Sequence, residues 1–297
     1  MKTLIIAPVL FLACSAAVET SAMSVPAPTP APTDVSAPTQ TDRETRVQAA
    51  HEHLDASDGG KALRVVIDAH GGLDTWFESG GLAFDFNYLP EGAPERRMFA
   101  RSEVDTWSVH VRQTELGDDA DAILGWDGRA AWITPSASTF PAPAAFWATT
   151  PYYFVGIPWV LADPGTSHIL QDTVALPVLD GSTRTVNSIR VTYDPGTGQA
   201  PDDYYVVHSD ADTGELVALR YIVTDPTVRG ADAPPPRETL FFFSQRQTIG
   251  GLVFAGHYDG FWWDDGQRGE RKSTVDVTNI DVTPTISLNA FAPPNTH

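Results

Sequence analysis

The stretch GLAFDFNY, residues 81–88, decides the fold class of this chain. Every second residue from Leu82 to Tyr88 is large and apolar, and the residues between them are small or polar. A period of two over this length is typical of a β-strand that buries one face. We therefore expect a half-buried strand here, with Phe84 and Phe86 on the side of the core.

The same kind of pattern, separated by turn signals such as Asp180-Gly181 and Gly250-Gly251, continues toward the C-terminus. Further strands are predicted at residues 107–111, 123–134 (a hairpin around Asp127-Gly128), 169–176, 185–193, 203–208, 216–224, 239–248, 252–262 and 271–283. Because neighbours joined by short turns must be antiparallel, the fold class is mainly β. We expect one curved antiparallel sheet, an incomplete β-barrel of about 10 or 11 strands, since a sheet of that size curls or closes.

One segment breaks the pattern: residues 140–163, FPAPAAFWATTPYYFVGIPWVLAD. It is rich in aromatic rings, lacks strand alternation and is interrupted by four prolines. We expect one or two short helices in a long crossover, a helical lid across the open side of the sheet. Because it is apolar on all sides, it must be buried against the sheet or against a ligand.

Short helices are predicted before the first strand, at residues 46–54 and 61–70, with a further turn of helix at 74–78. In the second, Leu63, Val66 and Ile67 form one apolar stripe, and Gly71-Gly72 marks its end.

The composition narrows the function classes. Lys and Arg total 19 against 38 for Asp and Glu, a net charge of −19. Such an acidic chain does not suit nucleic acid, which calls for a basic face. Its one cysteine excludes an intrachain disulfide and an all-cysteine metal site.

The N-terminus reads as an export signal. Residues 4–13 (LIIAPVLFLA) are apolar, too few to span a bilayer but suited to a signal-peptide core. Ala13 precedes Cys14, the only cysteine, and this pair resembles the lipobox of bacterial lipoproteins, although Phe11 stands where leucine is usual. The resemblance implies that Cys14 is lipidated and that the protein is exported and anchored at the outer membrane, facing the periplasm or the cell surface. An ordinary signal peptide, cleaved near Ala16, is the alternative.

Three short motifs resemble the LolA/LolB-like superfamily of lipoprotein carriers and sorting proteins. Asp127-Gly128 with Trp132 and Pro135 is similar to its hairpin ahead of the lid, and residues 210–219 (DADTGELVAL) are similar to a second hairpin. Residues 285–287, with Phe291 and Pro293-Pro294, are similar to its C-terminal end. The resemblance implies an incomplete antiparallel barrel with a helical lid over an apolar cavity.

On this basis the chain divides into a signal peptide (1–13), a lipidated N-terminus with a Pro/Ala/Thr linker (14–43) and one LolA/LolB-like β domain (44–297). The resemblance implies binding without catalysis or cofactors, the ligand being a lipid or an acylated molecule. Strand parity and the lid suggest the ligand-binding residues Phe84, Phe86, Trp107, Trp132, Phe146, Trp147, Tyr152, Phe154, Trp159, Leu219 and Tyr221, with Val217 beside them. Ordinary core packing is the competing interpretation of each.

Other residue clusters give less support for a functional site. His51 and His53 lie two apart and would diverge on a helix, so they do not form a zinc motif. Asp210 and Asp212 lack the glutamate of an EF-hand loop and fit a turn, while residues 194–203 remain a weak calcium candidate. The sequence contains no G-x-S-x-G elbow and no P-loop, so we expect no enzyme.

The Trp262-Trp263 pair beside Asp264 and Asp265 leaves a different function open, because paired tryptophans can stack on sugars. At the end of a strand, however, one ring would point inward and the other outward. We therefore expect an envelope lipoprotein that binds a hydrophobic or acylated ligand, in lipoprotein or lipid trafficking. A carbohydrate-binding or purely structural envelope lipoprotein is the alternative.

Overall fold

The computed structural model describes residues 38–117, 122–135, 140–141, 143–195, 202–224, 226–229, 234–282, 286 and 288–293. The predicted signal peptide, the lipidation site Cys14 and most of the predicted linker lie outside these residues. So does the middle of the candidate calcium loop, residues 196–201.

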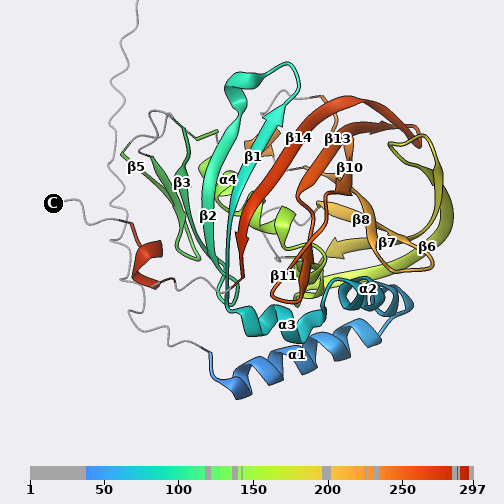
Figure 1. Ribbon diagram of the computed structural model, residues 1–297, viewed down its shortest axis with the longest axis horizontal. Coiled ribbons are helices and arrows are strands. Elements are labelled where there is room, and N and C mark those ends of the chain that lie inside the picture. Colours follow the sequence, from blue (N-terminus) through green and yellow to red (C-terminus); the bar gives the residue numbers. More distant parts are fainter. Residues whose placement is uncertain are drawn as a thin grey trace, which may run out of the picture. The chain divides into compact units, whose positions relative to one another are not determined.

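One antiparallel sheet of twelve strands dominates the described residues, which confirms the predicted fold class (Figure 1). Its order is β5-β4-β3-β2-β1-β14-β13-β10-β9-β8-β7-β6. The bounds are β1 Gly81–Pro90, β2 Met98–Asp105, β3 His110–Glu115, β4 Ile123–Trp126, β5 Ala131–Thr134, β6 Thr166–Pro177, β7 Thr183–Tyr193, β8 Tyr204–Asp210, β9 Leu216–Ile222, β10 Glu238–Ser244, β13 His257–Asp264 and β14 Gln267–Asp281. Pairing of β1 with β14 joins two meanders, so β5 and β6 are left as the two edges.

The sequence pattern missed β2 and misplaced the start of β3. In β2 the buried positions alternate regularly, but two of them are occupied by Ala100 and Ser102, which give no hydrophobic signal. Trp107 and Val109, predicted to lie in a strand, instead lie in the turn before β3, where Asp105 Oδ1 accepts from the Trp107 and Ser108 amides. The predicted strand at residues 107–111 was therefore wrong over its first half.

A second departure concerns residues 239–262, predicted as two long strands. The chain leaves the sheet after β10 and forms a separate hairpin of β11 (Gln247–Ile249) and β12 (Leu252–Phe254), then returns as β13. Gly71, in the predicted helix-ending pair, passes close to this hairpin. It has φ 108°, and a Cβ there would lie 2.3 Å from the Gly251 carbonyl oxygen.

Three helices precede the sheet: α1 (Gln40–Asp55), α2 (Asp58–Ala69) and α3 (Gly72–Ser79). Thr39 caps α1 in a capping box with Asp42, and the Ser57 hydroxyl caps α2. The predicted stripe on α2 is buried. Short helical turns occur at η1 (Pro94–Arg96), α5 (Pro226–Arg229) and η3 (Leu288–Phe291).

The crossover from β5 to β6 must pass from one edge of the sheet to the other, and residues 140–163 make that passage, as predicted. They form α4 (Ala144–Val155) and η2 (Trp159–Ala162). Figure 1 shows α4 within the curve of the sheet. The crossover packs on the inward residues of the sheet, so it covers the concave face.

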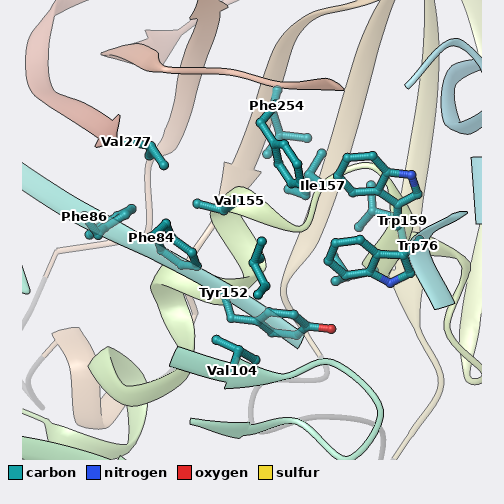
Figure 2. Packing of buried hydrophobic residues seen from close by; sticks show 14 of the residues in the cluster. Trp76, Phe84, Phe86, Val104, Tyr152, Val155, Ile157, Trp159, Phe254 and Val277 are labelled. Atoms are coloured by element: carbon teal, nitrogen blue, oxygen red, sulfur yellow. The ribbon is translucent and has the colours of Figure 1, made fainter. Parts of the chain in front are cut away.

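The core is divided by the sheet into two clusters. The larger one lies on the concave side and joins α1–α4, η2 and the inward residues of the sheet (Figure 2). The smaller one lies on the other side and joins Leu176 and Val178 of the β6–β7 hairpin to Val217, Phe242 and Phe261. Leu240 and Phe242 of β10 belong to the smaller cluster and Phe241 to the larger, as strand alternation requires.

Candidate functional site

The concave face beneath α4 is the candidate site. The helix AAFWATTPYYFV carries no charged residue, and its buried residues form one side of it. They are Trp147, Ala148, Pro151, Tyr152 and Val155. It packs against β2, β3, β4 and β5. Its N-cap Pro143 makes no side-chain hydrogen bond to the first turn. The helix is therefore held mainly by the apolar surface that it covers.

One polar contact ties the middle of α4 to the sheet. Pro151 has no N–H, so the Trp147 carbonyl four residues earlier lacks its helical donor. Gln113 of β3, fully buried, supplies the replacement: its Nε2 donates to the Trp147 carbonyl at 3.0 Å and to the Ala148 carbonyl at 2.9 Å. The Gln113 Oε1 atom has no partner among the described residues. Sequence reasoning missed Gln113, although a polar residue on the inward face of a strand was the available signal.

Aromatic contacts join α4 to both halves of the sheet. The half-buried Phe154 ring lies 5.1 Å from Phe241 and 6.0 Å from Tyr221, measured between ring centroids. It lies 6.2 Å from Phe86, and near the other end of the helix Trp147 lies 5.2 Å from Tyr88. A ring system of this extent buries large apolar areas and is continuous across the face.

The end of the crossover is fixed more firmly than its helix. Trp159 stacks on Trp76 of α3 with centroids 4.8 Å apart and an angle of 5° (Figure 2). The His168 Nε2 atom lies 2.8 Å from the Leu161 carbonyl oxygen. Arg46 of α1 pairs with Asp163 at 3.2 Å, which opposes the rise that burial causes in the pKa of Asp163.

The predicted ligand-binding residues fall into two groups. Nine belong to the concave cluster or pack against it: Phe84, Phe86, Phe146, Trp147, Tyr152, Phe154, Trp159, Leu219 and Tyr221. Trp107 lies instead beside the N-terminal helices, with the Arg46 guanidinium 4.9 Å from its ring. Trp132 lies against Gly125 and donates to the Phe291 carbonyl at 2.9 Å, and Val217 is in the smaller cluster. The structure thus brings the lid residues and the inward strand residues together, and places these three elsewhere.

Of two hollows in the described part of the chain, the smaller adjoins this cluster and the larger lies on the outer face of β1 and β14, and neither is a lipid-sized apolar channel. A cavity of about 10 Å³ beside His70, Ile157 and Phe254 has room for about one water. A larger one of about 560 Å³ is open to solvent and lined by polar side chains such as Asn87, Gln245 and Asp276. In this structure the rings of α4 therefore occupy the place where an apolar ligand was expected.

A single lysine lies at the rim of the concave cluster. Lys272 of β14 donates to the Thr239 hydroxyl at 2.9 Å, and its Nζ lies 4.8 Å from the Trp262 ring and 5.4 Å from the Tyr221 ring. Burial, with the charge of Arg96, lowers its pKa to about 8. Sequence reasoning missed this residue, because regular alternation from Val275 and Val277 places Lys272 on the opposite face.

A serine and a histidine also meet, on β7 and β8. Ser188 Oγ lies 3.0 Å from His208 Nδ1, and Arg220 Nε donates to His208 Nε2 at 3.1 Å. Burial and Arg220 lower the pKa of His208 to about 3, so the ring is neutral and its proton is on Nδ1. The Ser188 hydroxyl accepts that proton in a hydrogen bond, which is the opposite of activation by a general base.

The Trp262-Trp263 pair is divided, as predicted for a strand end. Trp262 lies between Lys272 and Arg237, whose guanidinium is 4.5 Å from the ring. Trp263 lies near Arg220 and packs against the smaller cluster. The two rings face different sides of the sheet and do not form a common platform for a sugar.

Several weaker candidates resolve into structural roles. Asp210 Oδ1 accepts from the Asp212 and Thr213 amides, as a hairpin turn requires. Within the described ranges no cluster of three or more His, Cys, Asp and Glu side chains suits a metal ion. Among the helices of these ranges, none has the length and apolar character to cross a membrane.

No family model and no curated protein matches the sequence. Over most of its length the chain is similar in fold to solved LolA-superfamily and lipoprotein-sorting proteins. A Vibrio parahaemolyticus domain named for outer-membrane lipoprotein sorting has 9% identity and a TM-score of 0.43, covering 84% of this chain and 97% of that one. A LolA superfamily protein from Nitrosomonas europaea has 7% identity and a TM-score of 0.47, and the match covers 77% of this chain and 96% of that one. The lipoprotein LppX from Mycobacterium tuberculosis has 12% identity and a TM-score of 0.30, and the match covers 78% of this chain and 100% of that one. These likenesses concern the fold, and no residue role is taken from them.

Proposed function

We propose that this protein binds the acyl chain of a lipid or of a lipid-modified molecule on the concave face of its sheet, beneath α4. The binding involves no chemical step. The protein is an exported lipoprotein, anchored at the outer membrane through Cys14, and hands its ligand between sites in the envelope.

The observation that carries this proposal is the nature of the segment that covers the face. The helix α4 buries one side, yet it carries no charged residue, makes no side-chain N-cap bond and contains Pro151. It makes two hydrogen bonds with Gln113, and its rings contact aromatic rings of the sheet beneath them. An acyl chain that displaces these rings would cover the apolar surface of the sheet in their place.

The energetics favour a flexible chain as ligand. Each CH₂ group that leaves water contributes about 0.8 kcal/mol. Moving a helix off the sheet exposes apolar rings, so several CH₂ groups are needed to offset the exposure. A short or polar ligand gains too little, which makes the site selective for long chains.

The test uses the full chain with Cys14→Ser, which removes the anchor, purified from the envelope without detergent. Native mass spectrometry followed by organic extraction reports any bound lipid. We expect a co-purifying acyl lipid that is lost in Phe154→Asp, which places a charge in the ring cluster.

The matched control is Phe99→Asp, which introduces the same charge beside the polar outer cavity. Circular dichroism must show both variants folded. A lipid-free mass for the native chain, together with no uptake of a fluorescent fatty acid, contradicts the proposal and leaves a structural envelope protein.

A further inference from the structure

We propose that Lys272 holds the negatively charged group of an amphiphilic ligand, an oxyanion such as a carboxylate or phosphate, at the rim of the concave face. This inference rests on the proposed function, since the chain attached to that group is the one that lies beneath α4.

A bulge turns Lys272 toward the concave side. Ser273 pairs with Gly260 and Arg271 pairs with Phe261, so the register between β13 and β14 shifts and Lys272 is the extra residue. Arg271 lies near Phe261 of the smaller cluster, on the outer face. Without the shift, Lys272 and Arg271 would exchange faces. Bulges of this kind re-aim side chains and are frequent beside functional sites.

The groups that Lys272 contacts on the concave side are all neutral. They comprise the Thr239 hydroxyl at 2.9 Å, the Tyr221 hydroxyl at 3.5 Å and the two rings of Tyr221 and Trp262. Among the ion pairs of the described residues, none includes Lys272. By contrast, Lys61, the other lysine in the described ranges, pairs with Asp58 at 3.3 Å.

An ammonium without a carboxylate is unusual in a chain where acidic residues outnumber basic ones 38 to 19. Removing such a charge from water is costly unless it is paired. Burial indeed lowers its pKa. A structural lysine at this position would be more stable as a neutral residue, whereas an incoming oxyanion would supply the missing partner.

The position of Lys272 fits an amphiphile rather than a free anion. The Tyr221 ring lies near Lys272 and is also 6.0 Å from Phe154 of α4. The same side chain therefore links the charged rim to the apolar cluster. The Lys272 carbonyl accepts from the Glu91 amide, which places the lysine level with the end of β1. A chain beneath Phe154 can thus extend its head group to Lys272.

The experiment compares three probes by equilibrium dialysis on the full chain carrying Cys14→Ser. Oleate has chain and charge, methyl oleate has the chain alone, and inorganic phosphate has the charge alone. Lys272→Met keeps the apolar stem and removes the ammonium, and Lys61→Met is the matched control at an exposed lysine.

We expect Lys272→Met to weaken oleate binding about tenfold or more, equivalent to about 1.4 kcal/mol. Methyl oleate should bind the native chain and both variants alike, and Lys61→Met should bind oleate as the native chain does. The urea midpoint of Lys272→Met should not fall, which separates loss of a ligand contact from loss of folding.

Equal binding of oleate by the native chain and Lys272→Met overturns the head-group site and leaves the proposed function intact. Phosphate binding without oleate binding overturns the assignment to an amphiphile. If neither oleate nor methyl oleate binds the native chain, both this inference and the proposed function fail.

Discussion

Two sets of helices cover this sheet, and they are built differently. The helices α1 and α2 have polar outer faces and side-chain caps, Thr39 and Ser57, and the Ser57 hydroxyl also donates to the His168 carbonyl of β6. The helix α4 has no side-chain N-cap bond, no charge and a proline in its middle, and its polar link to the sheet is Gln113. Both bury apolar residues against the same cluster.

The difference separates a helix that belongs to the scaffold from one that can leave it. Caps and i→i−4 hydrogen bonds stabilise a helix whether or not it is docked. The helix α4 lacks a side-chain N-cap and the one hydrogen bond that Pro151 cannot donate, so local opening of α4 should cost less than opening of α2. This is the property that a cover over a ligand site requires.

The largest effect is expected in the scaffold. Leu63→Ala removes a side chain of α2 that is 0% exposed. It should lower the free energy of unfolding by about 2–5 kcal/mol. Phe146→Ala, at a partly buried position of α4, should cost about 1 kcal/mol. Urea denaturation measures both free energies of unfolding. Equal losses would contradict the difference between the scaffold helices and α4.

A smaller effect is expected at the contact between α4 and the sheet. Gln113→Leu removes both donors to the Trp147 and Ala148 carbonyls and leaves them buried, at a cost of about 1–3 kcal/mol. Amide hydrogen exchange should become faster within residues 144–155 and stay unchanged in α2. Acceleration in both helices alike would show that α4 is no separate unit.

The rim of the site should respond to pH. The titratable groups facing Lys272 are Arg96 and Tyr221, and burial raises the pKa of that tyrosine, so it stays neutral. An alkyl sulfonate, whose charge does not titrate, should bind about tenfold more weakly at pH 9.5 than at pH 7, since the lysine pKa is about 8. A bound anion raises the pKa of Lys272, because it stabilises the charged ammonium. A flat profile would show that the ammonium does not contact the ligand.

The smallest effect concerns a cap. Ser57→Ala removes the hydroxyl that accepts from the Gly60 amide at 2.9 Å, and should lower the free energy of unfolding by about 1 kcal/mol without altering fatty-acid binding. A loss of binding would connect α2 to the site and contradict its role as scaffold.

Much of the fold follows from the sequence because the alternation of apolar residues is strong where strands bury large side chains, as in β1. It fails for β2, whose buried positions hold Ala100 and Ser102. The crossover could be predicted from its composition, since its prolines argue against a strand and its aromatic residues argue for burial. Trp107 misled the prediction because Asp105 folds a turn that interrupts the alternation.

For the candidate site, sequence reasoning reached the ring cluster but missed its polar contacts. The inward direction of Lys272 depends on a bulge that one residue of register creates, and no local pattern announces it. Gln113 becomes meaningful only once Pro151 is seen to leave a carbonyl free above it. Such pairings depend on tertiary position and lie beyond periodicity.

The most direct test of a displaceable cover is hydrogen–deuterium exchange of the full Cys14→Ser chain with and without saturating oleate. We predict that exchange changes within residues 144–155 and in the facing strands β9 and β10, while α2 exchanges as before. Oleate binding that leaves the exchange of α4 unchanged would place the ligand elsewhere and contradict the account.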